Sequence, residues 1–244
     1  MTEPAQALAL SPLLDVAALN AAFRVHRRLH IPDVLTPDSA EALTAAMEAY
    51  DGWRVTVDAG GERFEIPLTG GRAAEPGKQS WIDQAALNGA DAGMQYIFDT
   101  RRITVESIGD DVQDAVAAMP AFLHNPAFIA FVRGVTGDDR IDFADAQATR
   151  YRPGHVLTGH NDDAEGKNRL YAYVLNLTRD WRVDWGGALI FPGTDGQIQQ
   201  GFVPRFNALN IFAVPMDHAV TQVASFAGAD RLSITGWLRS LAAV

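Results

Sequence analysis

The sequence predicts an α+β protein, with a mainly helical first part (residues 1–140) and a β core in residues 141–244. Apolar residues recur at helical spacing in the first part, whereas short strands follow one another without helices in the second. The chain has 244 residues, of which 48% are hydrophobic and 20% are charged. This length and composition fit one globular domain with a sizeable core.

Two segments of the first part have helix signals. Residues 36–50 open with a Thr-Pro pair and continue with apolar side chains at helical spacing. Residues 110–137 are expected to be helical in two or three pieces, broken near Pro120 and Pro126 and ended by Gly137. These helices are expected to pack on the β core.

Between these helices, the segment "WRVTVDAGGERFEIPL" alternates around Gly60 and Gly61. Such a pattern predicts a hairpin that turns at the glycines. The following "TGGRAAEPGKQS" has loop composition. Residues 53–85 could therefore form a flap over a cleft or a plain surface excursion, since loops of this length are often functional.

Beyond Ile141 the strand signals come at close spacing, separated by Gly, Pro, Asn and Asp. Several such strands without intervening helices indicate a sandwich or a barrel rather than a parallel sheet. The predicted strands are "IDFADAQATRY", "LYAYVLNL", "GGALIF", "NALNIFAV", "HAVTQV" and "RLSITGWLR".

Charge and composition exclude several classes of protein. The net charge of −10 disfavours nucleic-acid binding, which depends on Lys and Arg. There is no cysteine, so any metal must be held by His and carboxylate. The N-terminal residues lack the pattern of a secretory signal, and no apolar run has the ~20 residues of a membrane helix. We therefore expect a cytoplasmic protein without a membrane segment.

His160 and Asp162 stand two residues apart in "GHNDDAEG", just before a predicted strand. Residues two apart in a strand project to the same face, so these side chains form a candidate chelating pair. The best third ligand among the six histidines is His218, which opens the predicted strand "HAVTQV". Two imidazoles and one carboxylate are the ligand set of non-haem Fe(II) oxygenases, although catalytic zinc also uses it.

The strand "RLSITGWLR" helps to decide between iron and zinc. Alternation places Arg231, Ser233, Thr235 and Trp237 on one face, and apolar side chains on the other. If the polar face lines the barrel interior, Arg231 needs an anion, because an unpaired buried charge is costly. A dicarboxylate co-substrate would supply that anion, whereas a zinc hydrolase would leave the arginine unexplained.

From Thr149 to Arg239 the chain resembles the Fe(II)/2-oxoglutarate-dependent dioxygenases, and more narrowly their prolyl 4-hydroxylase-like branch. The resemblance is carried by "RYRPGH", "HNDD", "YVLNLTRDW", "WGGALIFP", "FNALNIF", "HAV" and "RLSITGW", in this order and at compatible gaps. It implies a double-stranded β-helix, also called a jelly roll and related to the cupins, as the core in the C-terminal half.

The resemblance also implies roles for individual residues. His160, Asp162 and His218 would bind Fe(II), and Arg231 would pair with the distal carboxylate of 2-oxoglutarate. The remaining expected co-substrate residues are Ser233, Thr235, Tyr151, Tyr173 and Trp237. In some relatives a tyrosine that touches the co-substrate falls at Val174 of this chain. The implied cofactors are Fe(II), 2-oxoglutarate and O₂, with ascorbate as a reductant.

The implied function is hydroxylation of an unactivated C–H bond, with release of succinate and CO₂. The first substrate expected is a prolyl residue in a protein or peptide, and the alternative is a free amino acid or another small metabolite. Two further alternatives are a non-catalytic jelly-roll binding module and a nucleic-acid demethylase. The intact ligand set argues against the first, and the acidic net charge argues against the second.

Overall fold

The computed structural model describes residues 7–73, 75, 77–86, 88, 93–103 and 114–242. Residues 74 and 76 of the predicted loop and residues 110–113 of the second predicted helical segment lie outside this range. None of the helices in the described ranges combines the length and the apolar character that a bilayer span requires.

The start of α2 and both ends of α5 lie where sequence signals predict them. Helix α2 starts at Pro37 directly after Thr36, and α5 ends before Gly137, which has a positive φ of 70°. Asn125 caps α5 by accepting a hydrogen bond from the backbone N–H of Ala127 at 2.8 Å. The helices are α1 (Val16–His26), α2 (Pro37–Ala49), α3 (Lys78–Ala85), α4 (Met119–Leu123) and α5 (Pro126–Thr136).

The strands of the first part are β1 (Arg28–Pro32), β2 (Arg54–Ala59), β3 (Glu62–Thr69), β4 (Arg72–Ala73) and β5 (Tyr96–Ile103). The second part contains β6 (Phe143–Ala144), β7 (Ala146–Tyr151), β8 (Val156–His160), β9 (Arg169–Asn176), β10 (Leu189–Pro192), β11 (Ile198–Phe202), β12 (Ala208–Ala213), β13 (His218–Val220) and β14 (Arg231–Arg239). A short 3₁₀ helix, η1 (Val183–Trp185), precedes β10.

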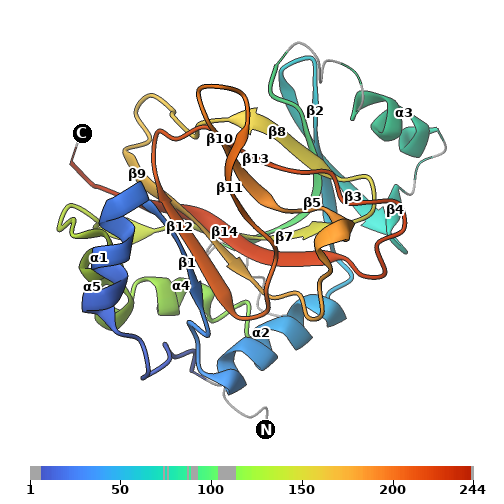
Figure 1. Cartoon of the computed structure of the whole chain (residues 1–244). Coiled ribbons are helices and arrows are strands. Elements are labelled where there is room, and N and C mark those ends of the chain that lie inside the picture. Colours follow the sequence, from blue (N-terminus) through green and yellow to red (C-terminus); the bar gives the residue numbers. More distant parts are fainter. Residues whose placement is uncertain are drawn as a thin grey trace, which may run out of the picture.

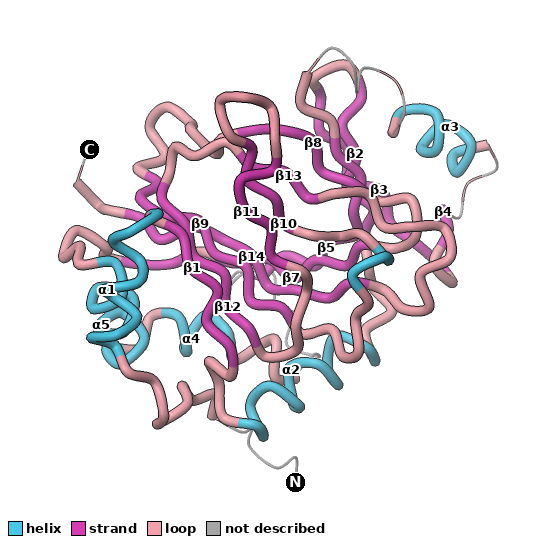
Figure 2. The backbone as a smooth tube through the Cα atoms, viewed as in Figure 1, coloured by secondary structure: helices cyan, strands magenta, loops and turns pink. Residues whose placement is uncertain are grey.

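The strands form one curled antiparallel sheet in the order β1-β12-β9-β14-β7-β5-β8-β13-β10-β11 (Figure 1). The two ends of this order meet through side chains, since Arg28 on β1 donates to Gln200 at 2.6 Å and to Gln199 at 2.7 Å on β11. This arrangement agrees with the expected jelly roll. Figure 2 shows the strands in the middle of the molecule and the helices at its periphery.

The expected division between a helical first part and a β core is incomplete. β2 and β3 pair as the predicted hairpin, with Ala59 opposite Glu62 across the two glycines. β1 and β5, however, also join the sheet, through β12 and through β7 and β8. The cause is tertiary, because both strands complete ladders with partners far along the chain, and local sequence patterns do not reveal such pairings.

The sheet has a different packing environment on each face. Leu232, Ile234 and Leu238 of β14 belong to the larger hydrophobic core, which also contains buried residues of α2, α4 and α5. A smaller apolar cluster occupies the inside of the curl and includes Tyr151 and Phe212. The alternation predicted for β14 is therefore present in the fold, and it directs the polar face of that strand to the inside.

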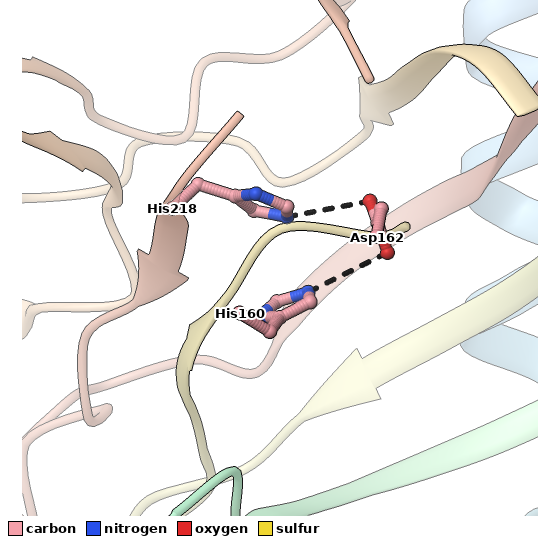
Figure 3. Close-up of side chains that lie close together, drawn as sticks. All are labelled: His160, Asp162 and His218. Atoms are coloured by element: carbon pink, nitrogen blue, oxygen red, sulfur yellow. Dashed lines mark ion pairs between the residues drawn. The ribbon is translucent and has the colours of Figure 1, made fainter. Parts of the chain in front are cut away.

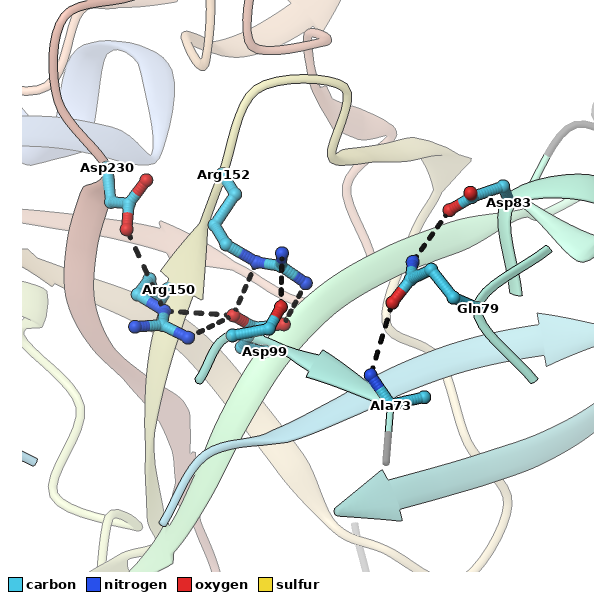
Figure 4. Close-up of polar contacts among 8 residues, drawn as sticks. Ala73, Gln79, Asp83, Asp99, Arg150, Arg152 and Asp230 are labelled. Atoms are coloured by element: carbon cyan, nitrogen blue, oxygen red, sulfur yellow. Dashed lines mark hydrogen bonds and ion pairs between the residues drawn. The ribbon is translucent and has the colours of Figure 1, made fainter. Parts of the chain in front are cut away.

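A buried carboxylate ties the predicted flap to the sheet (Figure 4). Asp99 on β5 is fully buried and lies 2.7 Å from Arg150 and 2.8 Å from Arg152. Arg152 also donates to the backbone carbonyl of Gly71, in the turn between β3 and β4, at 2.9 Å. The guanidinium of Arg152 therefore contacts both the buried Asp99 and the turn between β3 and β4.

Candidate metal centre and its cavity

Strand pairing brings two of the predicted metal ligands together. His160 ends β8 and His218 begins β13, and the two residues are direct partners in the antiparallel ladder. Their ring centroids lie 4.1 Å apart. The register of one ladder therefore sets the separation of the two imidazoles.

Asp162 completes the group, which we call the triad (His160, Asp162 and His218; Figure 3). Its carboxylate faces both rings from one side, with Oδ1 3.6 Å from Nε2 of His160 and Oδ2 3.4 Å from Nε2 of His218. Strand alternation predicts an extended backbone at Asp162, but the φ of this residue is +65°, which is left-handed. A left-handed residue just after β8 directs the carboxylate toward the rings, and Asp tolerates this conformation better than most residues.

The hydrogen bonds of the two imidazoles fix their tautomers. Nδ1 of His160 donates to the carbonyl of Thr158 at 2.9 Å, and Nδ1 of His218 donates to the carbonyl of Met216 at 2.8 Å. A carbonyl only accepts, so each Nε2 presents a lone pair. Metal-binding histidines commonly have such a second contact, which orients the ring.

The donor set of the triad fits a cation. Burial, followed by the neighbouring His160, lowers the pKa of His218 to about 4, so this ring is uncharged at neutral pH. The Nε2 lone pair of His218 then faces the carboxylate of Asp162, and Nε2 of His160 lies beside the same carboxylate. Their ligand atoms all lie within 4.8 Å of one another, and a metal ion placed among them would satisfy all three.

A cavity of about 250 Å³ extends from the triad into the barrel and reaches Arg231. Its walls are mostly apolar and aromatic, and include Tyr96, Phe98, Tyr151, Leu189 and Phe212. A second, more open groove of about 590 Å³, here called the outer groove, shares the triad, Met94 and Arg169 with the cavity. The triad thus lies where an inner cavity meets an outer groove.

Arg231 is a buried cation without a counter-ion in the described part of the chain. It is 1% exposed, its Nε has no hydrogen-bond partner, and its closest polar contact is Oγ of Ser233, 3.5 Å from Nη1. The guanidinium lies 5.0 Å from the ring centroid of Tyr151. Burial lowers the pKa of Arg231 and raises that of Tyr151 to about 12. This arrangement favours an anionic ligand in the cavity.

The other predicted co-substrate residues occupy different environments. Thr235 and Trp237 line the cavity, and Tyr151 forms part of its wall. Ser233 is fully buried and does not line it. Tyr173 borders the cavity, but its hydroxyl donates to the backbone carbonyl of Asp145 at 2.8 Å. That proton is therefore used in a structural hydrogen bond rather than offered to a ligand.

Sequence reasoning missed four polar residues of the cavity, Arg63, Gln147, Thr149 and Arg169, of which the last two have contacts that bear on the site. Thr149 on β7 lines it two residues before Tyr151, and the alternation of "QATRY" could have indicated this position. Arg169 begins β9, and its guanidinium lies 3.6 Å from the ring centroid of Trp237. It also donates to the backbone carbonyl of Asp162 at 3.0 Å. No local pattern predicts that second contact, since it depends on the loop that follows β8.

His155 is the histidine nearest to His160 in the sequence, and it lies in the loop between β7 and β8. It is buried, being 5% exposed. In the described residues it does not belong to the group of possible metal ligands that contains the triad. Burial lowers its pKa to about 4.

The fold is an antiparallel jelly roll with the triad at the mouth of its inner cavity. Residues 146–239 match the family model of the 2OG-Fe(II) oxygenase superfamily. Members of the family use Fe(II), 2-oxoglutarate and O₂. The matched range includes the triad, Arg231, Thr149 and Arg169.

Among curated proteins, prolyl 3-hydroxylase OGFOD1 of Xenopus laevis is 33% identical over 117 residues. The match covers 45% of this chain and 22% of that relative, so it spans about a fifth of the relative's length.

Two solved structures show the same fold at low sequence identity. A prolyl-4-hydroxylase from Pseudomonas putida has a TM-score of 0.57 and 18% identity, covering 93% of this chain and 100% of that one. A prolyl hydroxylase from Trichoplax adhaerens, solved with a peptide fragment of the hypoxia inducible factor oxygen degradation domain, has a TM-score of 0.57 and 16% identity. It covers 92% of this chain and 89% of that one.

Proposed function

We propose that the protein is an Fe(II)- and 2-oxoglutarate-dependent dioxygenase that hydroxylates a prolyl residue of a protein or peptide, releasing succinate and CO₂. One observation carries the proposal: three converging metal-type ligands and an unpaired buried arginine share one cavity. The family match over residues 146–239 supports the reaction class. The curated and structural relatives support the prolyl substrate.

In this proposal His160, Asp162 and His218 hold the iron. Three protein ligands would leave coordination positions for co-substrate and O₂. Fe(II) bound there supplies O₂ activation coupled to the oxidative decarboxylation of 2-oxoglutarate. The Thr158 and Met216 carbonyls keep the two rings oriented, so the geometry is set before any ligand arrives.

Arg231 binds the distal carboxylate of 2-oxoglutarate. A guanidinium and a carboxylate form strong charge-assisted hydrogen bonds, and burial excludes the water that would weaken them. The surrounding apolar side chains keep this part of the cavity dry. A binding module without catalysis is the alternative from another class, and it would not need a ligand set and an anion site facing the same cavity.

The substrate reaches the triad through the outer groove. Arg169 lies at the junction of groove and cavity, held by Trp237, and it has no carboxylate partner in the described chain. Its remaining N–H groups are free to bind an oxygen of the substrate. A peptide carbonyl is one such acceptor, and the carboxylate of a free amino acid is the alternative. Met94, which is 49% exposed, supplies apolar contact at the same place.

The test is an anaerobic titration of the metal-free protein with Fe(II) and 2-oxoglutarate, followed by exposure to oxygen. We expect a weak visible charge-transfer band on addition of both, and succinate after oxygen is admitted. Variants His160→Ala and Asp162→Ala should lose both signals. Succinate formation that survives in these variants would disprove the assignment of the triad.

A second experiment separates the substrate classes. Proline-containing peptides and free proline are offered at equal concentration, and hydroxylation is followed by mass spectrometry. Turnover of peptides alone supports the prolyl-residue proposal, and turnover of free amino acid alone contradicts it. The position of the hydroxyl is then read by NMR, because the sequence relative is a prolyl 3-hydroxylase and the structural relatives include a prolyl-4-hydroxylase.

A further inference from the structure

Two hydroxyl groups lie next to each other on the inner face of the sheet near Arg231. Thr149 on β7 and Ser233 on β14 are direct partners across the ladder. Oγ1 of Thr149 lies 2.8 Å from Oγ of Ser233 and 3.1 Å from the Ser233 carbonyl oxygen. Thr149 is 2% exposed and Ser233 is fully buried. The fold gives no evident structural reason for a buried pair of hydroxyls beside the unpaired guanidinium of Arg231.

Only one member of the pair reaches the cavity. Thr149 lines it together with Arg231, whereas Ser233 does not. Nη1 of Arg231 lies 3.5 Å from Oγ of Ser233, so the guanidinium is directed toward the pair. Thr235, the other hydroxyl of the strand that lines the cavity, is four residues from Arg231, a distance of roughly 13 Å along a strand. Thr149 is therefore better placed than Thr235 to share a ligand with the guanidinium.

We infer that Thr149 is the hydroxyl that binds the distal carboxylate of 2-oxoglutarate beside Arg231, with Ser233 as its supporting partner. The inference rests on the proposed function. Thr149 takes the place of Ser233 and Thr235, which the sequence suggested as the direct contacts of the distal carboxylate. The inference also accounts for Val174, which presents no hydroxyl to the cavity that it lines.

The hydrogen bonds balance in both states. Without the diacid, Thr149 donates to the carbonyl of Ser233, and Ser233 Oγ donates to Thr149 Oγ1. With the diacid, the Thr149 hydroxyl rotates to donate to the carboxylate, and Ser233 continues to donate to Thr149. A hydroxyl that accepts one hydrogen bond becomes a stronger donor for the next. Ser233 thus strengthens the contact without touching the ligand.

The arrangement selects for a second carboxylate. A keto acid without one would leave the buried guanidinium unpaired, which is costly in a dry site, while Thr149 would keep its hydrogen bond to the Ser233 carbonyl. The selectivity between 2-oxoglutarate and 2-oxopentanoate, which lacks the distal carboxylate, therefore measures the contribution of each anchor residue.

The experiment is isothermal titration calorimetry of the full chain with Mn(II) as a redox-inert metal. Both keto acids are titrated into the wild type and into Thr149→Val, which keeps the shape of the side chain and removes the hydroxyl. We expect roughly 10-fold weaker binding of 2-oxoglutarate and unchanged binding of 2-oxopentanoate, since one hydrogen bond to a charged group is lost. Thr149→Ser should restore most of the affinity, and Ser233→Ala should show a smaller loss.

Thr100→Val is the matched control. Thr100 is fully buried opposite Thr149 on β5, its hydroxyl contacts Gln147, and it does not itself line the cavity. Both keto acids should bind this variant as they bind the wild type. An equal loss for both keto acids in Thr149→Val, no loss at all, or a selective loss in Thr235→Val instead would overturn the inference. Arg231→Met tests the proposed function separately, because unchanged selectivity there would remove the anchor itself.

Discussion

His160 and His218 stand directly opposite each other in the ladder between β8 and β13, and each ring is oriented by a backbone carbonyl two residues before it. The two imidazoles are therefore positioned by regular structure, whereas Asp162 follows β8 in the next loop. Sites built on strands keep their geometry better than sites built on loops, so the two imidazoles are expected to be preorganised in the metal-free protein.

Removal of one ring should abolish tight metal binding. In His160→Ala the triad loses one of three ligands, and we expect the affinity for Fe(II) to fall by more than the roughly 10- to 100-fold typical of changes to residues that only orient a ligand. Competition against a metal-sensitive dye under anaerobic conditions measures this affinity. The control is His124→Ala, since His124 is exposed on the surface. An unchanged affinity in His160→Ala would contradict the assignment.

The left-handed backbone at Asp162 predicts a difference between two substitutions. Asn adopts this conformation readily and Ala does not, at a cost of about 1–2 kcal/mol. Asp162→Ala should therefore be less stable than Asp162→Asn by about that amount in the metal-free state, while both lose the metal. Urea unfolding gives the comparison. Equal stabilities would mean that the backbone at this residue relaxes after substitution.

Arg169 is expected to act on the substrate rather than on the co-substrate. Arg169→Met keeps most of the apolar stem, which lies against Trp237, and removes the cation. The KM for the hydroxylated substrate should rise about 10-fold or more, because a hydrogen bond from a charged donor is lost. The KM for 2-oxoglutarate should stay the same. Arg182→Met, at an exposed surface ion pair, is the control.

The buried ion pairs of Asp99 predict a large stability effect. Asp99→Asn leaves Arg150 and Arg152 without their shared buried carboxylate, and breaking such a pair costs about 3–5 kcal/mol. Asp230→Asn removes only a partly exposed carboxylate 3.9 Å from Arg150, and should cost less than about 1 kcal/mol. Chemical unfolding distinguishes the two variants. A small effect in Asp99→Asn would show that solvent reaches the arginines.

The buried imidazole of His155 predicts how stability changes with pH. Burial lowers its folded-state pKa to about 4, whereas the usual value is about 6.5. The unfolded chain therefore takes up a proton first as the pH falls. Stability from this group is complete above about pH 6.5 and is lost between there and pH 4, with a slope on the order of 1 kcal/mol per pH unit.

In His155→Gln this loss should be absent, so the difference in unfolding free energy between the two proteins should change across that window and be constant above it. The measurement is urea unfolding of both metal-free proteins at a series of pH values. A difference that stays constant from pH 7 to pH 4 would show that His155 titrates normally in the folded state.

The sequence by itself determined the residue types of the site and, for β14, the face on which they lie. The spacing of His160 and Asp162, the position of His218 before a strand and the alternation of β14 indicated a metal site and a buried arginine. These patterns are local, since they follow from side-chain directions within one strand. The hairpin at Gly60 and Gly61 was predictable for the same reason.

Only the tertiary structure decided which segments pair and what surrounds each side chain. The β8–β13 register, the inclusion of β1 and β5 in the sheet, the left-handed turn at Asp162 and the contact between Thr149 and Ser233 join residues far apart in the chain or depend on such neighbours. Strand pairing is selected by packing of the whole barrel rather than by local propensity, which is why the ligands could be named from the sequence while their arrangement could not.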